Sequence, residues 1–237
     1  MAAPKENAGI EGLEEARALL GGSVLGPDAV AEAFGAPLGK LLTAEEHARI
    51  RRLPFDRATL HRAEAEGAVL VLRVPRDPVG ALSILRLRER FPQAFAAKGL
   101  TDGVGYQLRS EWTAAAQPFA AEAPDLGWRL VSAAPPAETL GRTHAQQAAA
   151  LAAYAARLGV SPTRARRRSA IDAAYDLTLA FATDSRRLLA TAWDWTRTET
   201  SDGAYVTVGN FGAGGLQILA YSAAVRFGSL GMCPEVR

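Results

Sequence analysis

The final segment, Trp193 to Arg237, constrains the fold most, because it reads as short strands joined by glycine turns. Valines alternate with other residues in 204–208, glycines cluster in 209–215, and an apolar run in 216–221 leads to further glycines. Residues two apart in a strand share a face, so Trp193 and Trp195 are expected to pack together in a core. The segment predicts four short strands, at about 191–198, 204–209, 215–221 and 227–233.

The region before residue 100 has the spacing of several short helices and one strand. Helices are expected at Glu11–Leu20, Pro27–Phe34, Thr43–Arg52 and Asp56–Glu66, followed by a buried strand at Ala68–Val74 and a helix at Val79–Arg90. Thr43 with Glu46 three residues later is the reciprocal capping pattern that begins a helix. We place a domain boundary near residue 100, in the glycine-containing stretch 99–105, which gives a mainly helical region 1–100 and a second domain 101–237.

Beyond that boundary, 106–112 is expected to be extended, and Gly127–Val131 reads as a strand. Two helices follow, one from Thr143, capped by Gln146, to Leu158, and one from about Ser169 to Leu189. Arg164, Arg166, Arg167 and Arg168 lie between them and are interpreted as a solvated basic linker. The order strand, helix, helix, strands predicts an α+β fold.

Composition sets the broad class of the protein. The chain has 237 residues, 49% hydrophobic and 22% charged, which is enough to bury a sizeable core. The net charge of +2 does not indicate a polyanionic partner, and Cys233, the single cysteine, cannot form an intramolecular disulfide. The polar N-terminus and the absence of a long apolar run predict a cytoplasmic protein without membrane insertion.

Few residues carry a recognisable chemistry. His47, His61 and His144 stand far apart, so no metal site is predicted, and the glycine-rich stretch 209–215 precedes a strand rather than the helix that a phosphate-binding loop needs. Cys233 has apolar neighbours and is expected to be a small buried side chain. No catalytic residue and no cofactor are predicted.

The strand and glycine spacing resembles one known family. The residues on which this resemblance depends are 127–132, the two helices, 195–198, Asp202-Gly203, 208–211, Gly215 and Leu230-Gly231. Over residues 104–237 they resemble the C-type-lectin-fold domain of bacterial variable proteins that are diversified by retroelements. The resemblance implies that a strand near the start of the domain pairs with the last strand, and that the late strands and loops form a ligand-binding face.

The leading hypothesis is therefore a non-enzymatic binding protein that presents this face to a protein or other macromolecular ligand. Aromatic and arginine side chains suit such a role, because they offer a large contact area with few rotatable bonds. The expected ligand-binding residues are Asn210, Leu219, Tyr221, Ser222, Val225, Arg226, Phe227 and Ser229.

Two alternatives stay open. The first is an enzyme of unrecognised type that uses Asp194, Arg197 and Glu199, and the second is a nucleic-acid accessory protein that uses Arg164 to Arg168. Three structural expectations accompany the leading hypothesis. The strand at 227–233 should pair antiparallel with Trp128–Val131, Trp128 and Trp195 should be buried, and Tyr221, Arg226 and Phe227 should share one accessible surface.

Overall fold

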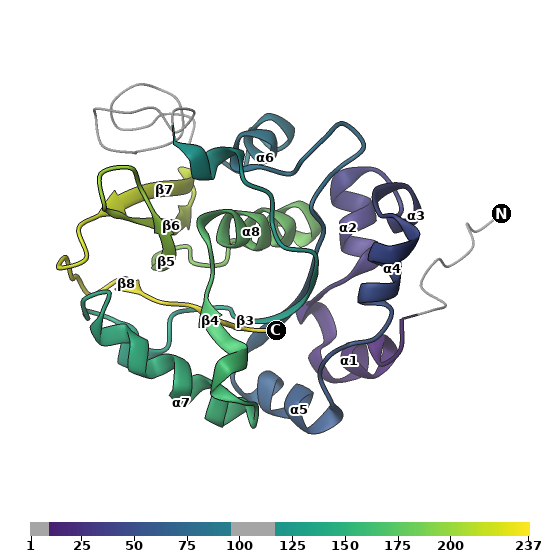
Figure 1. Ribbon diagram of the computed structural model, residues 1–237, viewed down its shortest axis with the longest axis horizontal. Helices are drawn as coiled ribbons and strands as arrows, with labels where there is room; N and C mark the ends of the chain where they lie inside the picture. Colours follow the sequence, from purple (N-terminus) through teal and green to yellow (C-terminus); the bar gives the residue numbers. More distant parts are fainter. Residues whose placement is uncertain (1–9, 96–116) are drawn as a thin grey trace.

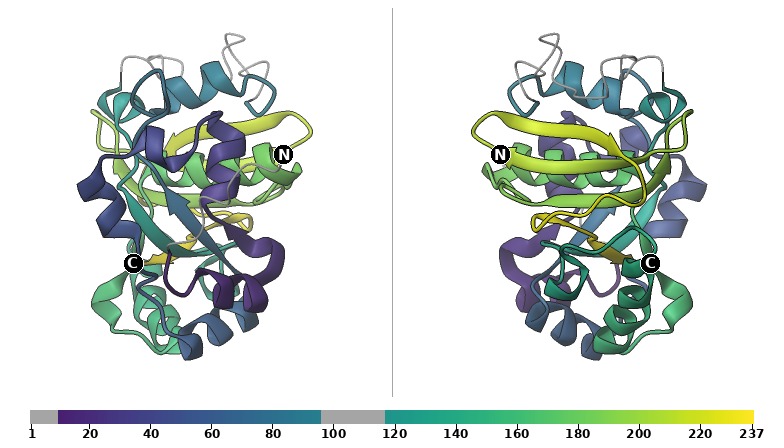
Figure 2. Two further views of the ribbon diagram at one scale, coloured as in Figure 1. Left: turned by 90° about the vertical axis from the view of Figure 1, so that its right-hand side faces the viewer. Right: turned by 90° about the vertical axis from the view of Figure 1, so that its left-hand side faces the viewer.

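The computed structural model describes residues 10–95 and 117–237 (Figures 1 and 2). Within these residues the chain forms helices and two separate β-sheets, so the predicted α+β class is confirmed. The expected boundary near residue 100 and the expected extended stretch 106–112 lie outside the described residues.

The N-terminal part supplies short helices, and the sequence patterns predicted all of those described except Leu38–Leu41. Their bounds are α1 (Leu13–Leu20), α2 (Pro27–Phe34), α3 (Leu38–Leu41), α4 (Ala44–Ile50), α5 (Arg57–Ala65) and α6 (Ile84–Arg90). The reciprocal bonds between Thr43 and Glu46 begin α4, and the Asp56 carboxylate accepts the Thr59 N–H at the start of α5. Each of these caps satisfies amide groups that the first turn of a helix leaves without a partner.

One predicted helix begins later than expected. Val79 lies in a turn between Arg76 and Ala81, which form an isolated antiparallel bridge, and α6 starts only after Ser83. The reason is local, because the Asp77 carboxylate accepts the N–H groups of Val79 and Gly80 at 2.8 and 2.9 Å and stabilises the turn. Val79 is consequently 75% exposed at the tip of this turn.

The first sheet has the strand order β1-β2-β3-β9-β4. The strands are β1 (Val24–Leu25), β2 (Ala68–Arg73), β3 (Gly127–Ser132), β9 (Pro234–Val236) and β4 (Ala165–Arg167). β2 pairs antiparallel with β3 over its whole length, from Ala68 opposite Ser132 to Arg73 opposite Gly127. Strands from before residue 100 and from the last residues of the chain therefore share one sheet.

The second sheet has the order β7-β6-β5-β8. Its strands are β5 (Trp193–Glu199), β6 (Tyr205–Gly212), β7 (Gly215–Tyr221) and β8 (Leu230–Gly231). β5, β6 and β7 form an antiparallel meander, whereas β8 runs parallel to β5. The right-hand view of Figure 2 shows this sheet from its outer side, with α8 behind it.

The long helix α8 (Ala170–Asp184) lies at the centre of the molecule (Figure 1). It starts at the predicted cap, where the side chains of Ser169 and Asp172 bond reciprocally to backbone N–H groups, and it contacts strands of both sheets and helices α2 and α6. It ends at Asp184, before the predicted Leu189, because Ser185 takes a left-handed conformation with φ 62°. No helix within the described residues is both long and apolar enough to cross a membrane.

The other predicted helix of this region also starts late. Thr143 and Gln146 form their reciprocal bonds, but in a turn that precedes α7 (Ala149–Leu158). Figure 1 shows α7 and α5 together at the lower edge of the molecule. Both expected tryptophans are buried, Trp128 at 2% and Trp195 at 0% exposure, which confirms their predicted burial.

The predicted pairing of the last strand needs correction. The strand that pairs antiparallel with β3 is β9, with Val236 opposite Leu130, and not the segment 227–233. Within that segment Leu230 and Gly231 join β5 in the second sheet instead. The apolar residues 230–233 are buried where the chain crosses from one sheet to the other. Their apolar character suits either sheet and therefore did not reveal which one they join.

Candidate ligand-binding face

The outer side of the second sheet carries an aromatic face. The register places Tyr205 opposite Tyr221 and Thr207 opposite Leu219, with Trp195 on the other side of Thr207. These side chains alternate with Val206, Val208, Ile218 and Ala220, which are buried on the inner side that faces α8. Strand alternation thus gives this small sheet two apolar sides, one inside the main core and one outside it.

The outer side is covered only in part. Trp193, Trp195 and Leu230 form a small buried cluster of their own, and five partly buried side chains pack against it: Tyr205, Leu219, Tyr221, Val225 and Phe227. We call these eight residues together the aromatic face. The rings of Tyr221 and Phe227 meet edge to face, with centroids 5.6 Å apart. The five side chains that pack against the buried cluster therefore keep part of their surface in contact with solvent.

The turn segment 222–229 is held to the sheet and to the segment before α7 by backbone hydrogen bonds. The Trp193 N–H donates to Ser229 O at 2.8 Å, the His144 N–H to Ala223 O at 3.1 Å, and the Gly141 N–H to Leu230 O at 3.2 Å. Because both ends of the segment are tied down, Val225 and Phe227 are presented from a fixed backbone.

His144 borders the aromatic face and has the environment of a neutral ring. It stacks on Tyr205 with ring centroids 3.8 Å apart, and its Nε2 lies 3.2 Å from Thr196 O. A carbonyl accepts only from a protonated nitrogen, so this contact requires the proton on Nε2. Burial, followed by the nearby charge of Arg167, lowers the pKa of His144 to about 4.

Arg167 supports the face from beneath. Its guanidinium donates to Gln147 Oε1 at 2.8 Å, to Trp195 O at 3.1 Å and to His144 O at 2.5 Å, so it connects β5 to the segment before α7. Burial lowers its pKa to about 10. The contacts of Arg167 within the chain fix the position of His144 relative to the sheet.

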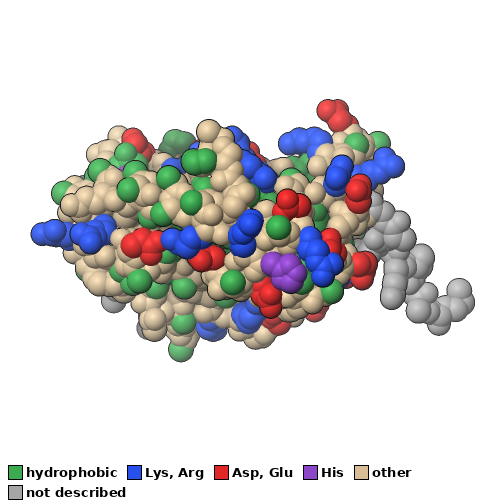
Figure 3. Space-filling model, turned by 90° about the horizontal axis from the view of Figure 1, so that it is seen from below, with side chains coloured by type: hydrophobic (Ala, Val, Ile, Leu, Met, Phe, Trp, Pro, Cys, Tyr) green, Lys and Arg blue, Asp and Glu red, His purple; other side chains and the backbone are tan. Residues whose placement is uncertain are grey.

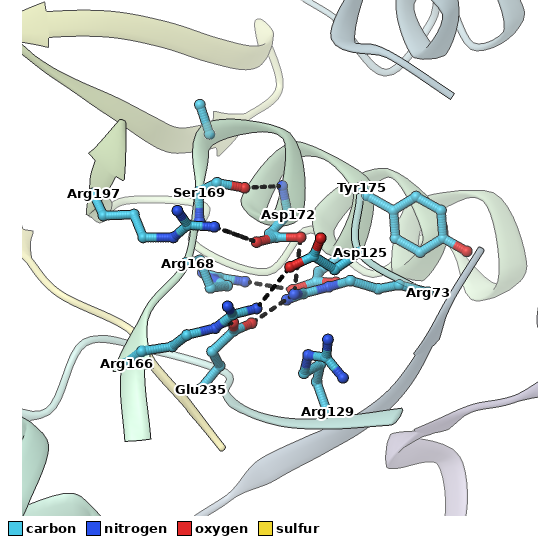
Figure 4. A network of polar contacts seen from close by, with 12 residues as sticks. Arg73, Asp125, Arg129, Arg166, Arg168, Ser169, Asp172, Tyr175, Arg197 and Glu235 are labelled. Atoms are coloured by element: carbon cyan, nitrogen blue, oxygen red, sulfur yellow. Dashed lines mark hydrogen bonds and ion pairs between the residues drawn. The ribbon is translucent and has the colours of Figure 1, made fainter. Parts of the chain in front are cut away.

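Behind the sheet, a buried network of ion pairs connects distant parts of the chain (Figure 4). Arg73 of β2 makes two bonds to Asp176 of α8, at 2.8 and 2.6 Å, and its Nη1 lies 3.0 Å from Asp172 and 2.6 Å from Glu235 of β9. Arg168 lies 3.0 Å from Asp176 and 2.8 Å from Asp194. Because Asp194 also accepts the Cys233 N–H at 2.7 Å, the network joins both sheets and α8 into one unit.

The structure brings together some of the predicted ligand-binding residues and not others. Leu219, Tyr221, Val225 and Phe227 belong to the aromatic face, and Ser222 and Arg226 are exposed in the turn segment beside it. Ser229 contributes its backbone carbonyl to Trp193. Tyr221 and Phe227 are only partly accessible, because they pack on each other and on the tryptophan cluster, whereas Arg226 is exposed as expected.

Asn210 lies apart from this group. It follows Gly209, at the opposite end of β6 from Tyr205, where the register between β6 and β7 shifts. Its backbone has φ 47°, and its N–H donates to Ala192 O at 2.7 Å. The structure therefore places Asn210 at an irregularity of β6 and not on the aromatic face.

Sequence reasoning missed His144 and Tyr205 as members or neighbours of the face. Tyr205 carried a usable signal, since it is in the same alternating run as Val206 and Val208 and must point to the opposite side. No pattern in the sequence indicated His144, because its position depends on Arg167 and on the turn segment 222–229, which are distant in sequence.

The three residues of the enzyme alternative do not form a common site. Asp194 is fully buried against Arg168, Arg197 is exposed with Nη2 4.0 Å from Asp172, and Glu199 is exposed. A hydrogen bond to Glu199 is the main cause that raises the pKa of Tyr205. A cavity of about 230 Å³ beside Arg197 is lined by Asp125, Ser169 and Asp172. Both carboxylates are already paired, Asp125 with Arg166 and Asp172 with Arg73.

The interpretation of Arg164 to Arg168 as a solvated linker is wrong. Arg167 and Arg168 are buried, Arg166 binds Glu235 at 2.5 Å, and Arg164 donates to Pro54 O at 2.8 Å. These arginines all make contacts within the fold, and Arg166 and Arg167 lie in the edge strand β4 rather than in a loop. Figure 3, which shows the face seen from below, has basic and acidic side chains interspersed rather than a continuous basic patch.

Within residues 10–95 and 117–237, no three His, Cys, Asp or Glu side chains gather as metal ligands. Comparison of the chain with protein families, with curated proteins and with solved structures found no match in any of the three.

Proposed function

We propose that this protein binds a protein or other macromolecular ligand through its aromatic face, without catalysing a reaction. The observation that carries the proposal is the partly exposed cluster of Tyr205, Leu219, Tyr221, Val225 and Phe227 on the outer side of the second sheet. Large apolar side chains gathered on a fixed scaffold and left partly in water are typical of interaction sites, because a partner can remove them from water at little entropic cost.

The flanking residues favour a macromolecular ligand over a small one. Arg226 is exposed in the turn segment beside Phe227, and Ser222 adds an exposed polar group. Aromatic residues and arginine are enriched in protein-binding surfaces.

We further propose that the part of the chain from β3 onward is a C-type-lectin-like domain of the kind found in retroelement-diversified variable proteins. Two features support this. The elements follow the order strand, two helices, three-stranded meander, and the final strand β9 pairs antiparallel with β3. The aromatic face then corresponds to the side of the domain on which the resemblance places the ligand.

The test compares partner capture by matched variants of the full chain. Arg226→Glu combined with Val225→Ser alters the exposed edge of the face, and Arg52→Glu changes an exposed arginine of the N-terminal part as the control. Proteins captured from an extract of the native host are quantified, and each candidate partner is purified and titrated by calorimetry. We expect the face variant to weaken binding by about tenfold or more and the control to bind as the unaltered chain does.

Hydrogen exchange then locates the contact. Adding the purified partner should slow amide exchange in 219–229 and leave exchange in α1 and α5 unchanged. Partners that bind the face variant and the control equally, or protection confined to other segments, would refute the proposal.

A further inference from the structure

A cavity is lined by residues of helices α2, α3 and α4. Figure 1 shows these helices on the side of the molecule opposite the second sheet. The cavity has a volume of about 380 Å³. The walls are apolar and built from Ile10, Pro27, Leu38 and Ile50, with the small side chains of Ala31 and Ala48 leaving the space open. A volume of this size lies within the range of small-molecule sites.

The rim of the cavity carries the cation Arg51, for which the described part of the chain supplies no anionic partner. His47 and Arg51 are four residues apart, at the end of α4, so both side chains reach the same side of the helix and line the cavity. Among the described residues, no carboxylate lies within ion-pair distance of Arg51. Asp28 also lines the cavity, but its Oδ2 accepts from Arg17 Nη2 at 2.5 Å, so its charge is already compensated.

We propose that this cavity binds a small amphipathic carboxylic acid, with an aliphatic chain of medium length against the apolar walls and the carboxylate on Arg51. A guanidinium forms two parallel hydrogen bonds with a carboxylate, and His47 adds a donor beside it. An uncharged apolar molecule would leave Arg51 without its counter-ion, and a large lipid exceeds the volume. The site is separate from the aromatic face and does not depend on its function.

The experiment titrates the full chain with octanoate and, in parallel, with 1-octanol, by calorimetry and by NMR chemical-shift changes of α2 and α4. Three variants are compared with the unaltered chain. Arg51→Gln removes the cation, Ala48→Trp fills the cavity from an exposed position, and Arg49→Gln is the control, since Arg49 is exposed on the same helix and does not line the cavity.

We expect saturable binding of octanoate that is tighter than that of octanol, a loss of about tenfold in Arg51→Gln, no saturation in Ala48→Trp and no change in Arg49→Gln. Absence of saturable octanoate binding to the unaltered chain would overturn the proposal. So would equal affinity for octanoate and octanol, or an unchanged affinity in Arg51→Gln. If Ala48→Trp lowers the melting temperature strongly, the Arg51→Gln and octanol comparisons decide.

Discussion

Replacing Arg73 by methionine tests whether the buried ion-pair network holds the two sheets and α8 together. The side chain of Arg73 is 0% exposed and faces Asp172, Asp176 and Glu235. Methionine fills much of the same space but leaves these carboxylates without their shared cation. Asp176 still pairs with Arg168, and Glu235 still pairs with Arg166. Asp172 is left with the long ion pair to Arg197, at 4.0 Å, which Figure 4 shows, so the loss falls mainly on Asp172.

Removing one partner from a buried ion pair costs about 3 to 5 kcal/mol, because an uncompensated charge stays in the interior. We expect Arg73→Met to lower the free energy of unfolding at pH 7 by an amount in this range. Because the total free energy of unfolding of a domain is about 5 to 15 kcal/mol, the variant should still fold but should be only marginally stable. Urea denaturation followed by tryptophan fluorescence measures the loss, and an unchanged m value confirms that the same surface is exposed on unfolding.

The pH dependence gives a second, independent check. Burial raises the pKa of Asp172, but the charge of Arg73 and hydrogen bonds from Ser169 outweigh it and hold that pKa below 3.8. The stability that Asp172 contributes in the unaltered chain is therefore present above about pH 4 and lost only below it. In Arg73→Met burial dominates, the pKa of Asp172 rises above its unfolded value, and protonation at mildly acidic pH removes the buried charge.

The difference in unfolding free energy between Arg73→Met and the unaltered chain should consequently shrink from pH 7 to about pH 4.5. Arg52→Met is the control, because Arg52 is exposed and its pair with Glu11 is long, at 3.5 Å. It should change stability by less than about 0.5 kcal/mol. A loss below about 1 kcal/mol in Arg73→Met at pH 7, or a difference that grows toward acidic pH, would refute the reasoning.

Three further predictions follow from the aromatic face and its surroundings. Trp195→Ala should cost about 3 to 5 kcal/mol in urea denaturation, because the ring is fully buried, and a cost below about 1 kcal/mol would contradict its core role. His144, with its pKa of about 4, stays neutral in the fold while the unfolded chain takes up a proton near pH 6.5, so stability should fall as pH drops through this window. His144→Phe should flatten that pH dependence, and an NMR titration midpoint above pH 6 would exclude the explanation. The Cys233 thiol, whose pKa burial raises, should react with a thiol reagent only in denaturant, and fast labelling of the native chain would show that it is accessible.

Much of the local structure could be predicted from the sequence. The bounds of α2 agree residue for residue, and Thr43 and Ser169 cap helices as their patterns indicate. These features depend on hydrogen bonds and side-chain periodicities that span only a few residues, so the information lies within the segment itself. The burial of Trp195 follows in the same way from alternation along one strand.

The buried network had a weaker signal in the sequence. Asp172 and Asp176 are four residues apart in a mostly apolar helix, and Arg73 ends an apolar strand, which together indicate buried charges that need partners. Their pairing joins positions 103 residues apart, and no local pattern specifies such a partner. The same holds for Arg166 to Arg168, which the sequence presents as a solvated basic run. In the fold Arg166 and Arg167 lie in the edge strand β4, and Arg167 and Arg168 are buried.

The sequence by itself determined the capped helices, the longer strands β2, β3, β5, β6 and β7, and the α+β class of this protein, because each of those depends on neighbours along the chain. Only the tertiary structure decided that residues 230–231 and 234–236 join different sheets, that Arg226 stays exposed while Arg167 is buried, and that His144 stacks on Tyr205. The physical reason is that strand pairing, charge pairing and partial burial are set by the groups that the folded chain brings together across the whole molecule.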